Sequence, residues 1–317
     1  MNKTALGVDI GGTNVKFALV NSHGEIIADH IELTPSSNPL PSVGIISDYI
    51  REFLEESNAS LDGIAGVGVG FPGAIELPEG IVRSAPNLRG WGGVHLGRLF
   101  YEDLGIEVAI DNDANLAALA EYRWGKYSGS NPLVLMTLGT GVGGGIVIDG
   151  KILHGAWGGA SEIGHMSVDL NGKLCKCGNR GCLEAYAGSR GISARAWELL
   201  KDDKGSLLWE EMDGSFDSLD AELVGIAAKN GDETALIIAR EVTKILGVGI
   251  ANLINIFNPA CLLIAGGMTE WGYEILLDPI KREASKRAFK AHFRSCRIDF
   301  AESGQWTGVL GAAAMVL

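Results

Sequence analysis

Three cysteines and one histidine lie close together between residues 165 and 182. Cys175, Cys177 and Cys182 fall within eight residues, and His165 precedes Cys175 by ten positions. Three thiolates and one imidazole make a complete tetrahedral ligand set for zinc, with no position left for water. The glycines of C-x-C-G-x-x-G-C let the backbone fold back so that the sulfurs can converge. The pattern therefore predicts a structural zinc site; the alternative is three small, buried hydrophobic residues.

A second group of residues able to do chemistry is Asp111-Asn112-Asp113, which follows the apolar segment 108–110. In an extended chain the two carboxylates lie on one side and Asn112 on the other. Ligand sites in open α/β sheets lie at such strand ends. One carboxylate is expected to cap the helix predicted from Ala114 onward. A cap does not account for both, so Asp113 is a candidate catalytic residue.

Two glycine turns have the composition of phosphate-binding loops. The first, Gly11-Gly12-Thr13, joins the predicted strands 6–10 and 15–20, and Lys16 lies in the second of these. Such a turn presents backbone N–H groups to phosphate, although a simple glycine hairpin explains this stretch equally well. Residues 133–149 repeat the order of strand, glycine turn with threonine, and strand. The repeat suggests two duplicated halves that face each other across a cleft.

The repeated turn, predicted to span residues 139–145, contains G-x-G-x-x-G, the spacing of a dinucleotide-binding fingerprint. That fingerprint requires a helix after the glycines, whereas a strand at 146–149 follows here, which argues against a Rossmann fold. A third glycine pair, Gly266-Gly267, ends the predicted strand 262–265. It would let a nucleotide base approach closely; an ordinary loop glycine is an equal alternative.

The elements that must position these residues alternate between strands and helices, as in an α/β protein. An acidic stretch, 201–220, interrupts them and is expected to be an irregular surface excursion. The last segment, 308–317, is rich in small residues that suit close packing. The helical spacing of apolar residues predicts the following helices: 46–54, 114–124, 232–257, 273–289 and 308–317.

The composition is that of an ordered globular protein of 317 residues, long enough for two domains. The net charge of −13, with no basic patch recognised, argues against a nucleic-acid partner. Neither a signal peptide nor a run of 18 apolar residues is evident, so no membrane association is expected. Clustered thiols suit a reducing compartment. The expected location is the cytoplasm.

The ordered set of motifs resembles the ROK family, named for repressors, open reading frames and kinases. The zinc cluster with its upstream E-x-G-H is the most specific of them. The matching segments are Asp9-Ile-Gly-Gly-Thr-Asn-Val-Lys16, Gly70-Phe-Pro-Gly73, Pro86-Asn-Leu88, Asp111-Asn-Asp-Ala-Asn115, Leu138-Gly-Thr-Gly141, Glu162-Ile-Gly-His165, Cys175-x-Cys-Gly-x-x-Gly-Cys-x-Glu184 and Ala265-Gly-Gly267.

The resemblance implies an α/β fold of the actin-like sugar-kinase (ribonuclease H-like) type, with two duplicated lobes and a structural zinc site. It places a small lobe at residues 1–120, to which helix 306–317 returns, and a large lobe at 121–305. A homodimer and closure of the lobes on sugar binding are further expectations, since kinases must exclude water.

The resemblance also implies a role for individual residues. Asp113 would be the general base, and His165 would serve both zinc and sugar. The expected sugar ligands are Gly73, Asn87, Asn112, Asp113, Glu162, His165 and Glu184. The expected ligands of ATP and Mg²⁺ are Asp9, Gly11, Gly12, Thr13, Lys16, Thr140, Gly141, Gly266 and Gly267; the zinc ligands are His165, Cys175, Cys177 and Cys182.

The implied activity is ATP-dependent phosphorylation of a hexose, with glucose at its 6-hydroxyl as the first expectation. Allose, mannose, fructose, N-acetylglucosamine and N-acetylmannosamine are the alternatives, because discrimination rests on pocket shape around one or two hydroxyls. A sugar-responsive repressor is the alternative of another class; it is disfavoured because the first phosphate motif begins within ten residues of Met1. Ser161 stands where the family has glycine before its E-x-G-H motif, which suggests a variation in sugar specificity.

Overall fold

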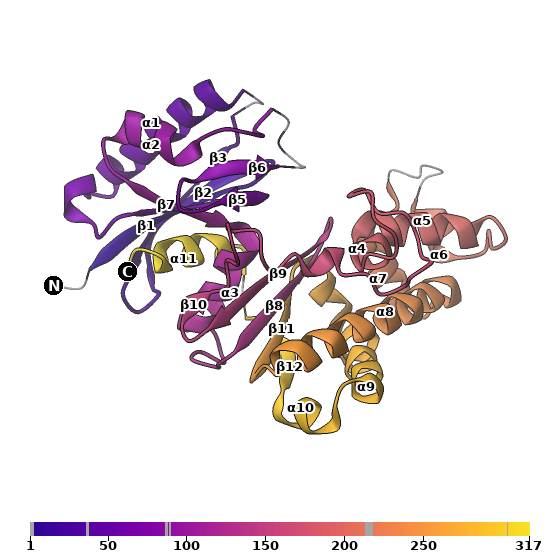
Figure 1. Cartoon of the computed structure of the whole chain (residues 1–317). Helices are drawn as coiled ribbons and strands as arrows, with labels where there is room; N and C mark the ends of the chain where they lie inside the picture. Colours follow the sequence, from indigo (N-terminus) through magenta and orange to yellow (C-terminus); the bar gives the residue numbers. More distant parts are fainter. Residues whose placement is uncertain (1–2, 36–37, 86–87, 89, 213–217, 303) are drawn as a thin grey trace. The chain divides into compact units, whose positions relative to one another are not determined.

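The computed structural model describes residues 3–35, 38–85, 88, 90–212, 218–302 and 304–317 (Figure 1). The chain divides into two compact units. The first unit comprises Met1–Ser130, Gly145–Ser161 and Glu302–Leu317, and the second comprises Asn131–Gly144 and Glu162–Ala301.

The first unit contains a five-stranded mixed sheet with the order β3-β2-β1-β4-β7. Strands β1 to β3 form an antiparallel meander, and β4 and β7 run parallel to β1. A separate hairpin, β5-β6, lies between β4 and β7 in the chain. The strands are β1 (Thr4–Ile10), β2 (Asn14–Asn21), β3 (Ile26–Leu33), β4 (Val67–Phe71), β5 (Ala74–Glu76), β6 (Ile81–Ser84) and β7 (Val108–Asn112).

Helices cover both faces of this sheet (Figure 1). On one face, large apolar side chains of β1 such as Leu6 and Val8 share a core with helices α1 and α2. On the other face lies α11, which packs on small side chains such as Ala5 and Ala18. It approaches the backbone of β1 closely, because a Cβ on Gly7 would lie 2.1 Å from the carbonyl oxygen of Val309. The predicted close packing of the C-terminal helix is confirmed. The helices are α1 (Pro39–Glu56), η1 (Leu61–Gly63), α2 (Leu96–Leu104), α3 (Asp113–Trp124) and α11 (Thr307–Ala314).

The second sheet repeats the plan of the first, with the order β10-β9-β8-β11-β12. Its central strand β8 pairs in parallel with β11, and β11 with β12, while β9 and β10 are antiparallel. The matching strand orders confirm the internal duplication predicted from the two glycine turns. The chain passes from the second unit into the first within β9. The strands are β8 (Leu133–Leu138), β9 (Val142–Ile148), β10 (Lys151–Ile152), β11 (Cys261–Ala265) and β12 (Arg297–Phe300).

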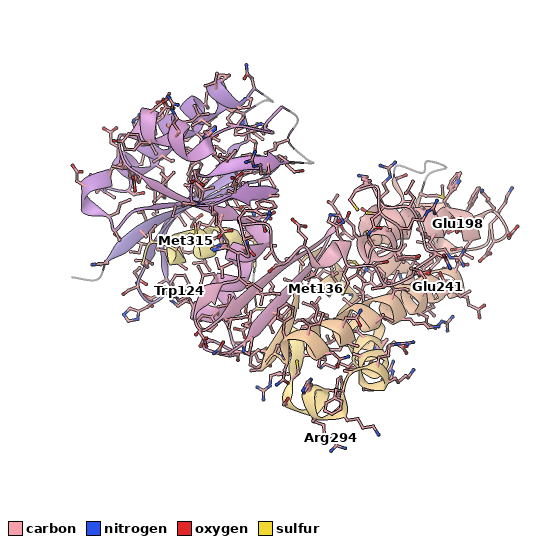
Figure 2. The ribbon with its side chains drawn as sticks, viewed as in Figure 1. Trp124, Met136, Glu198, Glu241, Arg294 and Met315 are labelled. Atoms are coloured by element: carbon pink, nitrogen blue, oxygen red, sulfur yellow. The ribbon has the colours of Figure 1, made fainter. Side chains whose placement is uncertain are left out.

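The helices of the second unit include α8, the longest of those described. Asp232 caps α8 by accepting a hydrogen bond from the Ala235 amide at 2.8 Å. Arg195 of α5 pairs with Glu241 of α8 at 2.7 Å and with Glu198 at 3.0 Å; both carboxylates are labelled in Figure 2. The helices are η2 (Ile163–His165), α4 (Glu184–Ala187), α5 (Ser189–Leu200), α6 (Leu207–Glu211), α7 (Ala221–Lys229), α8 (Glu233–Phe257), η4 (Gly267–Trp271), η5 (Tyr273–Leu277), α9 (Asp278–Arg287) and α10 (Lys290–Ser295).

Three expectations about segments were wrong. The second glycine turn is shorter than predicted, because β9 begins at Val142 rather than at 146; a Cβ on Gly145 would lie 2.5 Å from the Ala114 carbonyl oxygen, so glycine suits the packing of this strand on α3. The acidic segment 201–220 contains helix α6, which is anchored by the buried Leu208. A basic cluster also exists: residues 281–297 include seven Lys or Arg and one Glu, on α9, α10 and the start of β12.

The lobe boundaries expected at 120 and 305 also differ from the two units. Residues 145–161 belong to the first unit, not to the later part of the chain. Local contacts explain this: the Leu77 amide after β5 donates to the Trp157 carbonyl at 2.8 Å, and a Cβ on Gly158 would lie 2.1 Å from the Ile75 carbonyl oxygen. None of the helices in the described part of the chain combines the length and apolar character needed to cross a membrane.

Candidate active-site residues and metal cluster

Asp113 is the first residue of α3 and follows β7 directly. Its side chain is exposed, and its Oδ1 accepts a hydrogen bond from the Ala114 amide at 2.9 Å. The N-cap is Asn112, whose Oδ1 accepts from the amides of Ala114 (2.9 Å) and Asn115 (3.2 Å). The expectation that a carboxylate is the N-cap was therefore wrong. Asp113 lies at the positive end of the α3 helix dipole.

Asn112 also connects this turn to a second predicted site residue. Its Nδ2 donates to the Gly73 carbonyl at 2.9 Å. Gly73 has φ +135°, and a Cβ there would lie 2.0 Å from the Ser84 carbonyl oxygen, so only glycine fits. The structure thus brings Gly73, Asn112 and Asp113 together. Asn87 lies outside the described residues.

Asp111 is buried at 2% exposure beneath the same turn. Its Oδ1 accepts from the Asn112 amide (2.7 Å) and from Asn115 Nδ2 (2.9 Å), and its Oδ2 lies 2.5 Å from His154 Nε2. The hydrogen bond to Asp111 raises the pKa of His154, against a smaller lowering by burial. Sequence reasoning missed His154, since its partner is 43 residues away and no local pattern marks it.

Asp9 lies near the carboxyl end of the central strand β1, at the same ends of the parallel strands as Asp111. Parallel pairing places Asp9 opposite Gly70, and Gly70 opposite Asp111. Burial raises the pKa of Asp9 to about 6, repulsion by Asp113 adds to the increase, and Lys16 opposes it. A carboxylate in this electrostatic environment suits a hard divalent cation such as Mg²⁺, because the cation would favour its ionised form. Lys16 itself donates through Nζ to the Gln305 carbonyl at 2.8 Å.

The first glycine turn is held in place from both sides. The Gly11 amide donates to the Asn14 carbonyl at 2.9 Å, and Thr34 Oγ1 donates to the Gly11 carbonyl at 2.7 Å. Apart from its two chain neighbours, no atom of the described residues would lie within 4 Å of a Cβ on Gly12. The protein's own packing therefore does not require glycine at this position, whereas close approach of a ligand to the backbone would.

The second glycine turn contacts a predicted sugar ligand. Glu184 Oε2 accepts a hydrogen bond from the Val142 amide at 3.1 Å, and a Cβ on Gly141 would lie 2.3 Å from that same oxygen. Thr140 and Glu184 line a cavity of about 390 Å³ that Gly188 and Arg190 also border. The turn, the carboxylate and the cavity all belong to the second unit.

The third glycine pair packs against the end of β8. Gly266 has φ +94°, and a Cβ there would lie 2.3 Å from the Leu138 carbonyl oxygen. This contact gives Gly266 a structural reason to be glycine, whether or not a ligand lies beside it. A Cβ on Gly267 would meet no atom within 4 Å in the part of the chain that the structure describes, chain neighbours aside, so a ligand has room beside its backbone.

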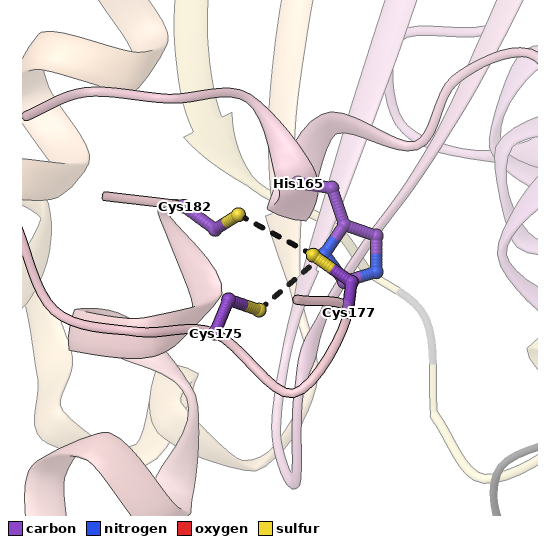
Figure 3. A group of neighbouring side chains, drawn as sticks. All are labelled: His165, Cys175, Cys177 and Cys182. Atoms are coloured by element: carbon purple, nitrogen blue, oxygen red, sulfur yellow. Dashed lines mark hydrogen bonds between the residues drawn. The ribbon is translucent and has the colours of Figure 1, made fainter. Parts of the chain in front are cut away.

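The four predicted zinc ligands come together in the second unit (Figure 3). Their ligand atoms lie within 4.8 Å of one another. Cys175 Sγ is 3.8 Å from His165 Nδ1, and Cys177 Sγ is 3.7 Å from Cys182 Sγ. Distances of this size correspond to the edges of a tetrahedron around an ion bound at about 2.0 to 2.3 Å. The residues therefore fit zinc.

The cluster contains thiols of different character. Burial raises the pKa of Cys182 to about 12. A hydrogen bond from the Asn179 backbone lowers the pKa of the exposed Cys177. A thiol must lose its proton to bind metal, so binding here would release protons and strengthen with pH.

The E-x-G-H segment is packed on the second glycine turn. The His165 amide donates to the Glu162 carbonyl at 3.1 Å, which closes the short helix η2. A Cβ on Gly164 would lie 2.0 Å from the Val142 carbonyl oxygen. Val142 thus contacts Gly164 through its carbonyl and Glu184 through its amide. The second unit thereby brings together Thr140, Gly141, Glu162, His165 and Glu184; the first unit carries Asp9, Gly11, Gly12, Thr13, Lys16, Gly73, Asn112 and Asp113.

Comparison with known proteins identifies relatives over nearly the whole chain. The glucokinase of Halalkalibacterium halodurans is 37% identical over 316 residues, which cover 98% of this chain and 94% of that protein. The xylose repressor of Caldicellulosiruptor bescii is 32% identical over 315 residues, with coverage of 98% and 77%. A solved ROK family glucokinase from Streptomyces griseus, in complex with glucose and AMPPNP, has a TM-score of 0.78 at 32% identity, covering 98% of both chains. Residues 5–317 match the ROK family, and the chain belongs to that family.

Proposed function

We propose that the protein is an ATP-dependent hexose kinase that phosphorylates the 6-hydroxyl of glucose. The observation that carries the proposal is the turn at the start of α3, where Asn112 serves as N-cap and Asp113 presents an exposed carboxylate. Similarity to glucokinases over nearly the whole chain supports the substrate.

Asp113 would act as general base. An aspartate at the N-terminus of a helix is ionised at neutral pH, so it can accept the proton of the sugar hydroxyl as that oxygen bonds to the γ-phosphorus. The bond from the γ-phosphorus to the bridging oxygen breaks, and ADP leaves. Such a transfer asks the protein mainly to align the nucleophile and the phosphoryl group and to stabilise charge.

The nucleotide would be held by the glycine turns. Gly12, Thr13, Thr140 and Gly141 would offer backbone N–H and hydroxyl donors to phosphate oxygens. Gly11, whose amide donates to the Asn14 carbonyl, would maintain the turn beside them. Gly267 leaves room beside its backbone for the adenosine. Asp9 would hold Mg²⁺, which supplies charge neutralisation on the phosphates.

The sugar would be bound by carboxylates and amides. Glu162 and Glu184 can each accept hydrogen bonds from a pair of vicinal hydroxyls. Asn112 Nδ2 uses one hydrogen for the Gly73 carbonyl and has a second to offer. His165 turns Nδ1 toward Cys175, so Nε2 is the nitrogen available to a sugar hydroxyl.

We further propose one structural zinc ion bound by His165 and the three cysteines. The ion would fix the orientation of the imidazole and of the segment that leads to Glu184, two residues after Cys182. A cytoplasmic homodimer is part of the same proposal. Light scattering on the purified protein would measure the mass of the assembly, and a monomer would exclude the dimer.

A sugar-responsive regulator is the second candidate function, favoured by the 32% identity to a xylose repressor over 98% of this chain. ATP-consumption assays with glucose, mannose, fructose, allose, N-acetylglucosamine, N-acetylmannosamine and xylose, scored by kcat/KM, separate the two functions. A kinase turns over at least one hexose, and Asp113→Asn does not. Sugar binding without ATP consumption would instead support a regulator.

A further inference from the structure

We propose that His154 is a positioning residue for catalysis, which acts through Asp111 to fix the turn that carries Asp113. This inference rests on the proposed kinase function. His154 lies in the loop after β10, and all of the groups involved belong to the first unit.

The Asp111 carboxylate ties three segments together. Oδ1 accepts from the Asn112 amide at the end of β7 and from Asn115 Nδ2 in the first turn of α3, at 2.7 and 2.9 Å. Oδ2 accepts a hydrogen bond from His154 Nε2 at 2.5 Å. Asp113 lies between Asn112 and Asn115 in the chain, so the two Oδ1 bonds bracket the proposed base. Any shift of Asp111 would therefore shift Asp113.

Burial of Asp111 explains why a histidine suits position 154. A buried carboxylate is costly unless a cation and hydrogen bonds compensate it. Asp9 and Asp113, which lie at the same ends of the strands, are acidic, and Lys16 beside Asp9 donates to the Gln305 carbonyl. His154 donates directly to Asp111 and supplies the positive charge when protonated.

The backbone around His154 is itself anchored. The Leu153 amide donates to the Ile146 carbonyl at 2.8 Å, and the His154 carbonyl accepts from the amides of Gly158 and Ala160, each at 3.1 Å. The imidazole thus extends from a fixed loop toward the turn, as a positioning role requires.

Substitution at position 154 tests this role. His154→Ala is expected to lower kcat by about 10- to 100-fold, with KM for sugar and ATP within about threefold, because small misplacement of a reacting group costs up to about 100-fold. His154→Gln keeps an N–H donor and is expected to regain kcat to within about fivefold of wild type. His30→Ala is the matched control, since His30 pairs with Glu32 at 2.8 Å in β3 of the same unit; it should leave kcat unchanged.

Wild-type kcat in a folded His154→Ala would overturn the proposal, and so would equal activity of His154→Gln and His154→Leu. If His154→Ala does not fold, the comparison of His154→Gln with His154→Leu still tests the proposal, because leucine fills the space of the side chain but has no N–H donor. An NMR titration separates this inference from the kinase proposal: the His154 pKa should lie above 6.5 and fall in Asp111→Asn. Absence of turnover in the wild type would defeat the kinase function, whereas an unshifted His154 pKa would defeat the pairing.

Discussion

The Asp111–Asp113 turn and the His165/cysteine cluster are stabilised in different ways. In the first unit, the Asp111–Asp113 turn is fixed by the protein's own hydrogen bonds: Asp111 has three donors within 3 Å, and Asn112 caps the following helix. In the second unit, His165 and three cysteines converge within 4.8 Å, and two of the thiols are buried. The hydrogen bonds of the chain organise the turn, whereas the proposed zinc ion would replace protons on the sulfurs of the cluster.

The largest effect is expected from Asp113→Asn. The amide keeps the size of the side chain but is a poor proton acceptor, so kcat should fall by about 10²- to 10⁴-fold. Calorimetric titration should show sugar affinity within a few-fold of wild type, because the turn depends on Asp111 and Asn112. Wild-type turnover in this variant would remove Asp113 from the mechanism.

Zinc removal should affect the His165/cysteine cluster of the second unit and leave the Asp111–Asp113 turn unchanged. Cys177→Ser, or a chelator, is expected to remove about one equivalent of metal. Sugar binding should weaken by about tenfold or more, because the metal would no longer hold the His165 ring in its orientation toward the sugar. The NMR signal and pKa of His154 in the first unit should persist. Cys296→Ser is the control, because Cys296 is a half-buried cysteine outside the cluster. A metal-free preparation with full activity would contradict the role of zinc.

Stability should depend on pH through His154. Its folded-state pKa is raised, so the stabilisation it provides is fully present below its unfolded value near 6.5 and is lost as the pH rises through the folded-state pKa. Denaturant unfolding of the wild type and of His154→Gln should therefore show a wild-type advantage at pH 6 that shrinks by pH 9. After allowance for solvent screening, the difference in free energy of unfolding between wild type and variant should fall by about 0.5 to 1 kcal/mol over this range. A constant difference would indicate that charge plays no part.

The smallest effect is expected at Ser161, which directly precedes the E-x-G-H segment. Ser161 has φ +67°, a region that glycine occupies more easily, and its Oγ is buried without a partner in the described chain. Ser161→Gly should stabilise the protein by about 0.5 to 1 kcal/mol in denaturant unfolding. The same variant, tested on the sugar panel, shows whether Ser161 affects sugar specificity through Glu162. Unchanged relative kcat/KM values across the panel would exclude such an effect.

Much of this protein could be predicted from residues that lie close together in the chain. The strand-turn-strand repeat predicted the duplicated sheets, and the Cys-rich segment predicted a set of four side chains that the structure brings together. The small residues of the last helix predicted close packing, and the structure shows that it packs on β1. Each of these depends on local spacing, which secondary structure and short loops preserve in the folded chain.

Tertiary structure decided what depends on pairs of distant segments. The contact of His154 with Asp111 spans 43 residues, and that of Glu184 with Val142 spans 42. The same holds for residues 145–161, which join the first unit through contacts with α3 and the β5 hairpin. Such contacts follow from strand order and sheet register, which no single stretch of sequence contains. The sequence by itself determined which residues could do the chemistry, and the fold decided which neighbours hold them in place.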